Sequence, residues 1–294
     1  METRLKGPPR LQALDGEPEW LRVGSVSLAV RRLDRVAAFY QDVIGLEVIT
    51  HEDGAIHLGV AGNALLELLH RPDAAPDDPA SAGLFHTAFL MPSRTDLGRW
   101  LAHFRTLGQP LDGAADHLVS EAVYLHDPEG NGIEVYADRP RAQWHWRDGS
   151  NGRRVEMANQ AIDMEGLLKI AETPWAGAPA GTRIGHVHLR VGNVSEARRF
   201  YGDLLGMDVT AAWDAAAFLS TGGYHHHLAA NIWRSAGAGP RDPARAGLAS
   251  MTLEVANSEA LAGIKRRAGE GGLHDPWGTM VQLRLAEPAR PPTL

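Results

Sequence analysis

The sequence has no cysteine, and this absence excludes several kinds of site. Disulfides, thiolate-bound zinc, iron–sulfur clusters and a cysteine nucleophile are all ruled out. The sequence also has no run of about 18 apolar residues, so we expect no membrane-spanning helix. Residues 1–20 carry charges and prolines rather than the apolar segment of a signal peptide. Together these absences predict a cytoplasmic protein.

A surplus of positive charge is missing too. The chain has 29 Lys and Arg against 36 Asp and Glu, which gives a formal net charge of −7. Such a balance argues against nucleic acids and anionic membranes as partners. The composition, 44% hydrophobic and 22% charged, is ordinary for a globular protein. Because 294 residues exceed what a single core usually holds, we expect two domains.

One local pattern occurs four times along the chain. Its first copy is predicted as strand, helix and three strands, at Val23–Val30, Asp34–Gly45, Leu46–Thr50, Ala55–Val60 and Ala64–His70. The dipeptide Phe39-Tyr40 recurs as Phe200-Tyr201, and Asp127-Pro128 recurs as Asp275-Pro276. Such self-similarity indicates duplication of one βαβββ unit. The four copies cover about residues 21–71, 83–138, 182–234 and 246–286, and we number these modules one to four.

We therefore predict an α+β fold in which four βαβββ modules form two cupped, mixed-sheet domains. The expected division is an N-terminal extension (1–20), a first domain (21–140), a connector (141–181) and a second domain (182–294). A short helix is expected near residues 164–171 of the connector. Its tryptophans, Trp144, Trp146 and Trp175, are expected to pack between the domains.

At two matching strand positions, residues able to bind a metal occur in only two of the four modules. The first strand carries His86 in module two and His186 in module three, where modules one and four have Ser25 and Ser250. Alternate residues of a strand share a face, so both histidines project into the predicted cup. The last strand of module two carries Glu134 among apolar residues, and a buried carboxylate needs a partner.

Two imidazoles and one carboxylate from three strands form the set that holds non-haem Fe(II) and leaves open positions. Here the predicted ligands are His86, Glu134 and His186. Neither half of the chain has the full set, because module four carries Gln282 in place of the glutamate. We therefore expect module two to pair with module three, and module one with module four, giving one metal site and one empty site. For each residue alone, an ordinary strand histidine or rim glutamate is the competing interpretation.

Residues 127–136 resemble the closing motif of the vicinal oxygen chelate superfamily, which includes glyoxalases, bleomycin-resistance proteins and type I extradiol dioxygenases, and residues 117–134 are similar to the extradiol enzymes. The resemblance covers nearly the whole chain and is strongest to two-domain catechol 2,3-dioxygenase-like proteins. Their motif has a histidine, a serine three residues later, a tyrosine before Asp-Pro and a terminal glutamate ligand, matched here by His117, Ser120, Tyr124 and Glu134. The run Gly223-Tyr-His-His-His-Leu228 resembles their segment with the acid–base histidine.

The resemblance implies an extradiol ring-cleaving dioxygenase that uses Fe(II) and O₂ on a small catechol-type aromatic. Mn(II) takes the same ligands and stays an alternative. The resemblance also implies that His117 hydrogen-bonds the bound oxygen species, that Tyr124 donates to the substrate or the ring-opening intermediate, and that one histidine of 225–227 moves a proton. His226 aligns best with the family, whereas strand alternation would set it on the opposite face from His225 and His227. A homo-oligomer is expected.

Two other functions stay open. A glyoxalase-type isomerase or lyase has the same fold, but it typically needs four protein ligands, and only one carboxylate is placed here. A non-catalytic protein that binds an aromatic compound or a drug would keep the cup without a metal. The sequence does not name the catechol. Five other histidines are expected to be surface or loop groups, namely His51, His57, His70, His103 and His145.

Overall fold

The computed structural model describes residues 18–149, 152–269 and 272–286. Most of the expected N-terminal extension, two residues of the connector, two residues of module four and the last eight residues therefore lie outside the described part. Within the described part, no helix combines the length and the apolar character that crossing a bilayer requires.

Module one follows the predicted pattern closely. Its elements are β1 (Leu21–Val30), α1 (Leu33–Phe39), the π-helical turn η1 (Tyr40–Ile44), β2 (Glu47–Glu52), β3 (Ala55–Val60) and β4 (Asn63–His70). The helical segment ends at Gly45, whose φ of 80° is the left-handed conformation that glycine adopts at little cost. Its apolar stripe is buried, including Val36, Tyr40 and Val43.

Modules two and three repeat this order. Module two has β5 (Gly83–Leu90), α2 (Arg94–Thr106), β6 (Gly113–Asp116), β7 (Ser120–His126) and β8 (Gly132–Asp138). Module three has β11 (Arg183–Arg190), α4 (Val194–Ala197), the π-helical η3 (Arg198–Leu204), β12 (Asp208–Trp213), β13 (Ala216–Ser220) and β14 (Leu228–Asn231). Module four departs from the prediction of three strands after the helix, because its described residues form only β15 (Gly247–Val255), α5 (Ser258–Ala268) and β16 (Met280–Leu285).

The connector contains the expected short helix and one hairpin that the sequence did not predict. Its elements are η2 (Arg141–Gln143), β9 (Trp146–Gly149), β10 (Gly152–Val155) and α3 (Met164–Lys169). Trp144 is buried with Val155 and Tyr224, so it packs the connector against module three as expected. The hairpin escaped prediction because its polar strands lack a regular apolar alternation.

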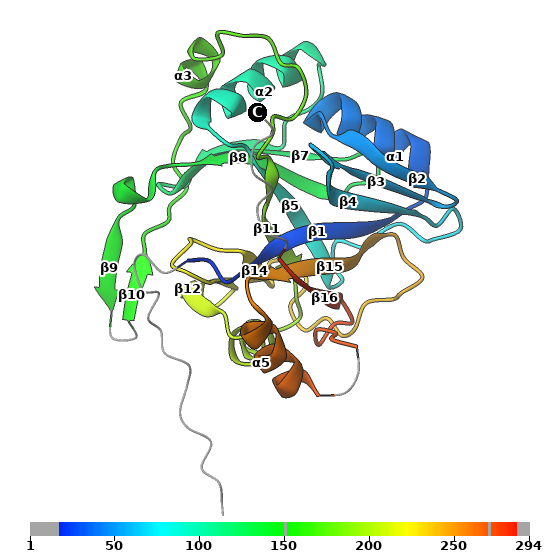
Figure 1. Cartoon of the computed structure of the whole chain (residues 1–294), viewed down its shortest axis with the longest axis vertical. Coiled ribbons are helices and arrows are strands. Elements are labelled where there is room, and N and C mark those ends of the chain that lie inside the picture. The colour runs from blue at the N-terminus through cyan, green and yellow to red at the C-terminus, as the bar shows by residue number, and fades with distance from the viewer. Residues whose placement is uncertain (1–17, 150–151, 270–271, 287–294) are drawn as a thin grey trace, which may run out of the picture.

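Each of the two large sheets combines one module from either side of the connector (Figure 1). The six-stranded sheet has the order β16-β15-β1-β4-β3-β2, and the eight-stranded sheet has the order β12-β13-β14-β11-β5-β8-β7-β6. Antiparallel pairs β1–β15 and β11–β5 join the modules. The expected pairing of module two with three, and of one with four, is therefore confirmed. The fold is α+β with two curled mixed sheets; the domain limits at 140 and 182 stay a prediction.

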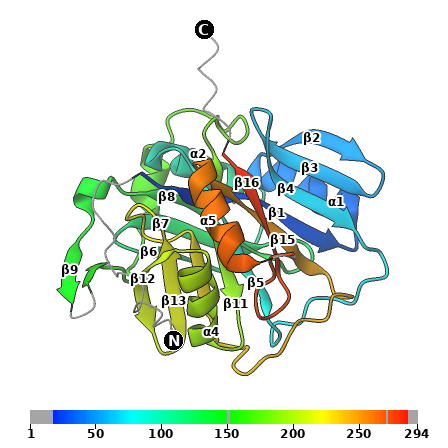
Figure 2. The ribbon, with the colours of Figure 1, turned by 60° about the horizontal axis from the view of Figure 1, so that its bottom comes forward.

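Helices cover the outer faces of the sheets and link the modules that are neighbours in sequence. Helix α5 packs against β15 and β16 (Figure 2). Trp100 of α2 is fully buried, and its indole Nε1 donates a hydrogen bond to the carbonyl of Val43 at 2.8 Å. The apolar core is thus shared between modules one and two, although their strands lie in different sheets.

In each half of the chain, the tyrosine of the Phe-Tyr dipeptide contacts the aspartate of the Asp-Pro dipeptide in the following module. Tyr201 of module three donates its hydroxyl hydrogen to Asp275 of module four at 2.8 Å, and Tyr40 of module one lies 3.5 Å from Asp127 of module two. Each aspartate also accepts hydrogen bonds from backbone N–H groups of its own turn. The tyrosine therefore fixes the Asp-Pro turn of the following module.

We expect Tyr201→Phe to lower the free energy of unfolding by about 1.5–3 kcal/mol, because a short buried hydrogen bond to a carboxylate is lost. Tyr40→Phe should cost less than about 1 kcal/mol, since its 3.5 Å contact is at the limit of a hydrogen bond. Urea unfolding of both variants measures the difference. Equal losses would contradict this ranking.

Candidate metal centre

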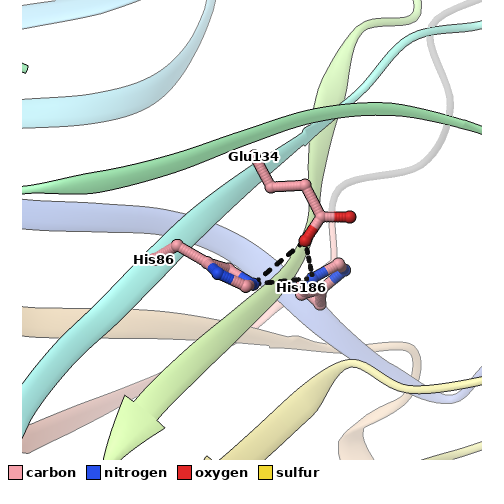
Figure 3. A group of neighbouring side chains, drawn as sticks. All are labelled: His86, Glu134 and His186. Atoms are coloured by element: carbon pink, nitrogen blue, oxygen red, sulfur yellow. Dashed lines mark hydrogen bonds and ion pairs between the residues drawn. The ribbon is translucent and has the colours of Figure 1, made fainter. Parts of the chain in front are cut away.

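Three strands at the centre of the eight-stranded sheet bring together His86, Glu134 and His186 (Figure 3). His86 lies on β5, Glu134 on the parallel neighbour β8, and His186 on the antiparallel neighbour β11. Oε2 of Glu134 is 3.0 Å from Nε2 of His86 and 3.1 Å from Nε2 of His186. The two Nε2 atoms are 3.3 Å apart. All three side chains are buried.

The spacing of these three donor atoms fits a metal ion. An ion with bonds of about 2.1 Å to N and O ligands at right angles sets its ligand atoms about 3.0 Å apart. The observed separations of 3.0, 3.1 and 3.3 Å are close to that value. Across residues 18–149, 152–269 and 272–286, no other group of three histidines or carboxylates is arranged in this way.

The protonation states are also those that metal binding requires. Burial would raise the pKa of Glu134, but the charges and hydrogen bonds of His186 and His86 outweigh it and hold the pKa well below its usual range. Burial lowers the pKa of His186 to about 4, against the pull of Glu134. At neutral pH the triad therefore offers an ionised carboxylate and a neutral His186 imidazole.

The six-stranded sheet has neutral side chains at the matching positions. His188 faces His86 across β11 and β5, and Ser27 faces Ser250 across β1 and β15. The position matching Glu134 beside β5 holds Gln282 beside β15. The two sheets thus share one register, and only one of them carries the triad.

His117 and Tyr124 form a hydrogen-bonded pair next to Glu134. Tyr124 lies directly opposite Glu134 in the β7–β8 ladder. The Nδ1 of His117 donates to the carbonyl of Ala158 at 3.0 Å, so its Nε2 accepts from the Tyr124 hydroxyl at 2.6 Å. Burial and the negative charge of Glu134 raise the pKa of Tyr124 well above its usual range. Tyr124 therefore stays protonated and able to donate.

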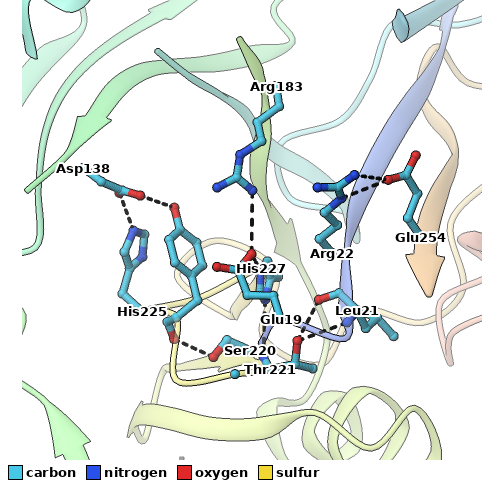
Figure 4. A network of polar contacts seen from close by, with 12 residues as sticks. Glu19, Leu21, Arg22, Asp138, Arg183, Ser220, Thr221, His225, His227 and Glu254 are labelled. Atoms are coloured by element: carbon cyan, nitrogen blue, oxygen red, sulfur yellow. Dashed lines mark hydrogen bonds and ion pairs between the residues drawn. The ribbon is translucent and has the colours of Figure 1, made fainter. Parts of the chain in front are cut away.

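The three consecutive histidines precede β14 instead of lying in a strand, so the alternation considered from the sequence does not apply to them. Nε2 of His225 contacts Asp138 at 2.9 Å, and Nε2 of His227 contacts Glu19 at 3.2 Å (Figure 4). His225 and His227 are fully buried, whereas His226 is 8% exposed. The ring of His226 lies 4.1 Å from that of His186, centroid to centroid. The geometry supports His226 as the member of the run that faces the triad.

An aromatic wall beside the triad had no role assigned from the sequence. The rings of Phe85 and His188 are 4.8 Å apart, and Trp233 lies 5.2 Å from Phe85. Strand alternation alone would set Phe85 on the face opposite His86. A bulge in the β5–β11 ladder leaves Phe85 without a partner and turns its ring toward His188. Trp233 is 55% exposed, a property that only the structure shows.

A second bulge explains why a glycine precedes His186. Gly185 is the unpaired residue between Ile184 and His186 in the β11–β5 ladder. A Cβ at this position would lie 1.7 Å from the hydroxyl oxygen of Tyr136. Any larger residue would have to displace Tyr136 or the strand that carries His186.

We expect Gly185→Ala to weaken metal binding by about tenfold or more, because a ligand displaced by about 1 Å no longer completes the triad. The metal content of the purified protein and a metal titration measure this. Gly113→Ala on β6 of the same sheet is the control, since its Cβ would meet nothing within 4 Å. Equal metal affinity in both variants would contradict the steric argument.

Glu19 anchors the start of β1 against the histidine run. Its carboxylate contacts His227 at 3.2 Å and Arg141 at 3.1 Å. Burial would raise the pKa of Glu19, but the hydrogen bond from His227 and the charges of His227 and two arginines lower it to about 2. A carboxylate with a lowered pKa stabilises the fold above its unfolded value of 4.5.

We therefore expect Glu19→Gln to be less stable than the wild type at pH 7. The difference should shrink as the pH falls from 4.5 to about 2, because Glu19 then becomes protonated in the folded state as well. Denaturant unfolding across this pH range, on metal-free protein, measures the effect. Glu165→Gln is the control, since this side chain is 87% exposed. A difference that persists at the acid end would refute the linkage.

The comparisons with known proteins agree with this geometry. The model of the Glyoxalase/Bleomycin resistance protein/Dioxygenase superfamily matches residues 22–135 and 183–283. The catechol-2,3-dioxygenase of Bacillus subtilis (strain 168) is 40% identical over 255 residues, which are 85% of this chain and 88% of that protein. The biphenyl-2,3-diol 1,2-dioxygenase 3 of Rhodococcus globerulus is 28% identical over 120 residues, or 40% of this chain and 63% of that protein.

A solved structure shares the architecture at lower identity. Glyoxalase I from Zea mays superposes with a TM-score of 0.55 at 16% identity, covering 90% of this chain and 92% of that chain. The chain therefore belongs to the glyoxalase/bleomycin resistance protein/dioxygenase superfamily. Within it, the 40% identity groups the chain with the catechol dioxygenases and supports the expectation of an enzyme of the extradiol dioxygenase class.

Proposed function

We propose that this protein is an extradiol ring-cleaving dioxygenase that acts on a small catechol-type aromatic with O₂ and Fe(II). The observation that carries the proposal is the buried triad of His86, Glu134 and His186 in a chain 40% identical to a catechol-2,3-dioxygenase. Mn(II) would use the same three ligands. The expected homo-oligomer stays a prediction.

His86, Glu134 and His186 would hold the ion on one side and leave its other positions open. A bound Fe(II) would supply adjacent positions for the two catechol oxygens and O₂, and a route for electron density from the ring to O₂. The aromatic wall of Phe85, His188 and Trp233 offers apolar surface beside these positions. An aromatic substrate would bury its ring there.

His226 is the proposed acid–base group. Burial and the neighbouring histidines lower its pKa well below the usual range, so it is neutral at pH 7. A neutral imidazole beside the triad can accept a proton from a catechol hydroxyl. The same group can return the proton when the ring opens.

Tyr124 and His117 are the proposed hydrogen-bonding groups on the β7 side of the triad, whereas His226 lies on the β14 side. Their 2.6 Å hydrogen bond holds the Tyr124 hydroxyl next to Glu134. Tyr124 would donate to an oxygen that gains negative charge during the reaction by turning its single hydroxyl hydrogen from Nε2 of His117 toward that oxygen. His117 orients that hydroxyl through its own bond to the carbonyl of Ala158.

A glyoxalase-type isomerase or lyase is a weaker proposal. It would require a fourth protein ligand, and the residues that the structure describes bring no further carboxylate or histidine into the group. A protein that only binds an aromatic compound would not need an ionised carboxylate between two buried imidazoles, an arrangement that is costly without a cation.

The test is O₂ consumption with catechol by protein reconstituted anaerobically with Fe(II), with detection of the yellow ring-opened product. We expect His186→Ala and Glu134→Gln to lose about 100-fold or more in activity and to lose bound iron, because the first removes one of three ligands and the second removes the negative charge of another. His51→Ala is the control, since His51 is exposed and lies on β2, an edge strand of the other large sheet.

Three outcomes separate the readings. Activity and iron lost together in both variants would support the proposal. Iron bound tightly by the wild type without turnover of any catechol would refute the reaction but leave the metal site. The third outcome is that neither Fe(II) nor Mn(II) raises the melting temperature of the wild type. Because a ligand that binds the folded state must raise it, this outcome would show that the proposed metal site is wrong.

A further inference from the structure

A carboxylate outside the triad reaches the proposed acid–base histidine through one intermediate residue. Asp138 ends β8, four residues after Glu134. Its Oδ1 accepts from Nε2 of His225 at 2.9 Å, and its Oδ2 accepts from the Tyr224 hydroxyl at 2.9 Å (Figure 4). His225 is fully buried, so its ring is held in one orientation by this contact and by the ring of Tyr224, 4.1 Å away.

The two neighbouring imidazoles share a hydrogen bond through their Nδ1 atoms. Nδ1 of His225 lies 2.8 Å from Nδ1 of His226. A carboxylate can only accept, so a neutral His225 carries its hydrogen on Nε2 and presents a lone pair at Nδ1. The hydrogen between the two rings must then belong to His226. This leaves Nε2 of His226 without a hydrogen.

We propose that Asp138 and His225 are positioning residues that set the tautomer of His226, so that the lone pair of its Nε2 is available to the substrate. The inference rests on the proposed function, because it presumes that His226 accepts the catechol proton. Neither residue touches the triad ligands by a hydrogen bond, and Asp138 and His225 act through His226. No bond other than O–H and N–H changes in this step.

The alternative tautomer would place a hydrogen on Nε2 of His226, where it could donate but not accept. Asn at position 138 permits this alternative, because its amide can donate to Nε2 of His225. His225 would then donate from Nδ1 to His226, and the order of donors along the chain would reverse. An imidazole held in the wrong tautomer loses about 10⁴-fold in kcat in a serine protease triad.

The test compares Asp138→Asn with Tyr224→Phe. The second variant removes the other hydrogen bond of Asp138 and the 2.8 Å hydrogen bond between the hydroxyls of Tyr224 and Tyr136, but it keeps the aromatic ring and the contact between Asp138 and His225. We expect Asp138→Asn to lower kcat for catechol by about 100-fold, the scale of general base catalysis, with KM and iron content changed less than about threefold. Tyr224→Phe should stay within about threefold of the wild type in all three.

A second readout does not depend on turnover. Nitrogen-15 NMR of the histidine rings in the metal-free full chain distinguishes an Nδ1–H from an Nε2–H tautomer. We expect His226 to be the Nδ1–H tautomer in the wild type and in Tyr224→Phe, and to become the Nε2–H tautomer in Asp138→Asn. A merely structural role for Asp138 would lower stability without this exchange.

An Nε2–H tautomer of His226 in the wild type would overturn the inference, as would an Asp138→Asn variant with unchanged kcat and tautomer. The failure of the proposed function looks different. In that case no catechol is cleaved by the wild type, while the tautomer exchange in Asp138→Asn still shows that the pair controls His226. If the wild type cleaves catechol but Asp138→Asn shows no tautomer exchange, the proposed function stands and only the positioning role of Asp138 and His225 is wrong.

Discussion

The antiparallel pairing of β5 with β11 is the contact on which the rest of the site depends. It joins modules two and three, which lie on opposite sides of the connector, into one eight-stranded sheet. His86 and His186 come from these two strands, and Glu134 comes from the neighbour of β5. A chain folded as two independent halves would separate the two histidines. Backbone hydrogen bonds between the halves therefore create the metal centre, while the helices and the shared core hold the modules that are neighbours in sequence.

The centre is held together although it buries charge. Glu134 is 3% exposed, and its stability as an anion depends on the two imidazoles within hydrogen-bonding distance. Around this triad the polar groups are paired in turn: Tyr124 with His117, and His225 with Asp138. These pairs fix ring orientations and tautomers, which is what a proton-transfer site needs. The two bulges at Gly185 and Phe85 then adjust the ligand strand and the aromatic wall by single residues.

Duplication explains both the symmetry of the scaffold and the asymmetry of the chemistry. The same tyrosine-to-aspartate contact closes each half, at Tyr40 with Asp127 and at Tyr201 with Asp275. The two sheets also share one register, so Ser250 and Gln282 stand where His86 and Glu134 stand in the other sheet. The scaffold contacts are therefore present twice, whereas the metal ligands are present once. The eight-stranded sheet carries the triad, whereas the six-stranded sheet repeats the scaffold without it.

The sequence by itself determined the four modules, the pairing of modules across the two halves of the chain, and the grouping of His86, Glu134 and His186. These follow from periodicity and from the complementary placement of histidine and serine in the repeats, which are local properties that a single chain displays. Tertiary structure decided what depends on a partner strand or loop. Strand alternation could not choose among His225, His226 and His227, because the run lies in a loop. There His225 is held by Asp138 and His227 by Glu19, which leaves His226 to face the triad. Nor could it place Phe85 beside His188, because a bulge is a mismatch between two strands and leaves no mark on the period of either one.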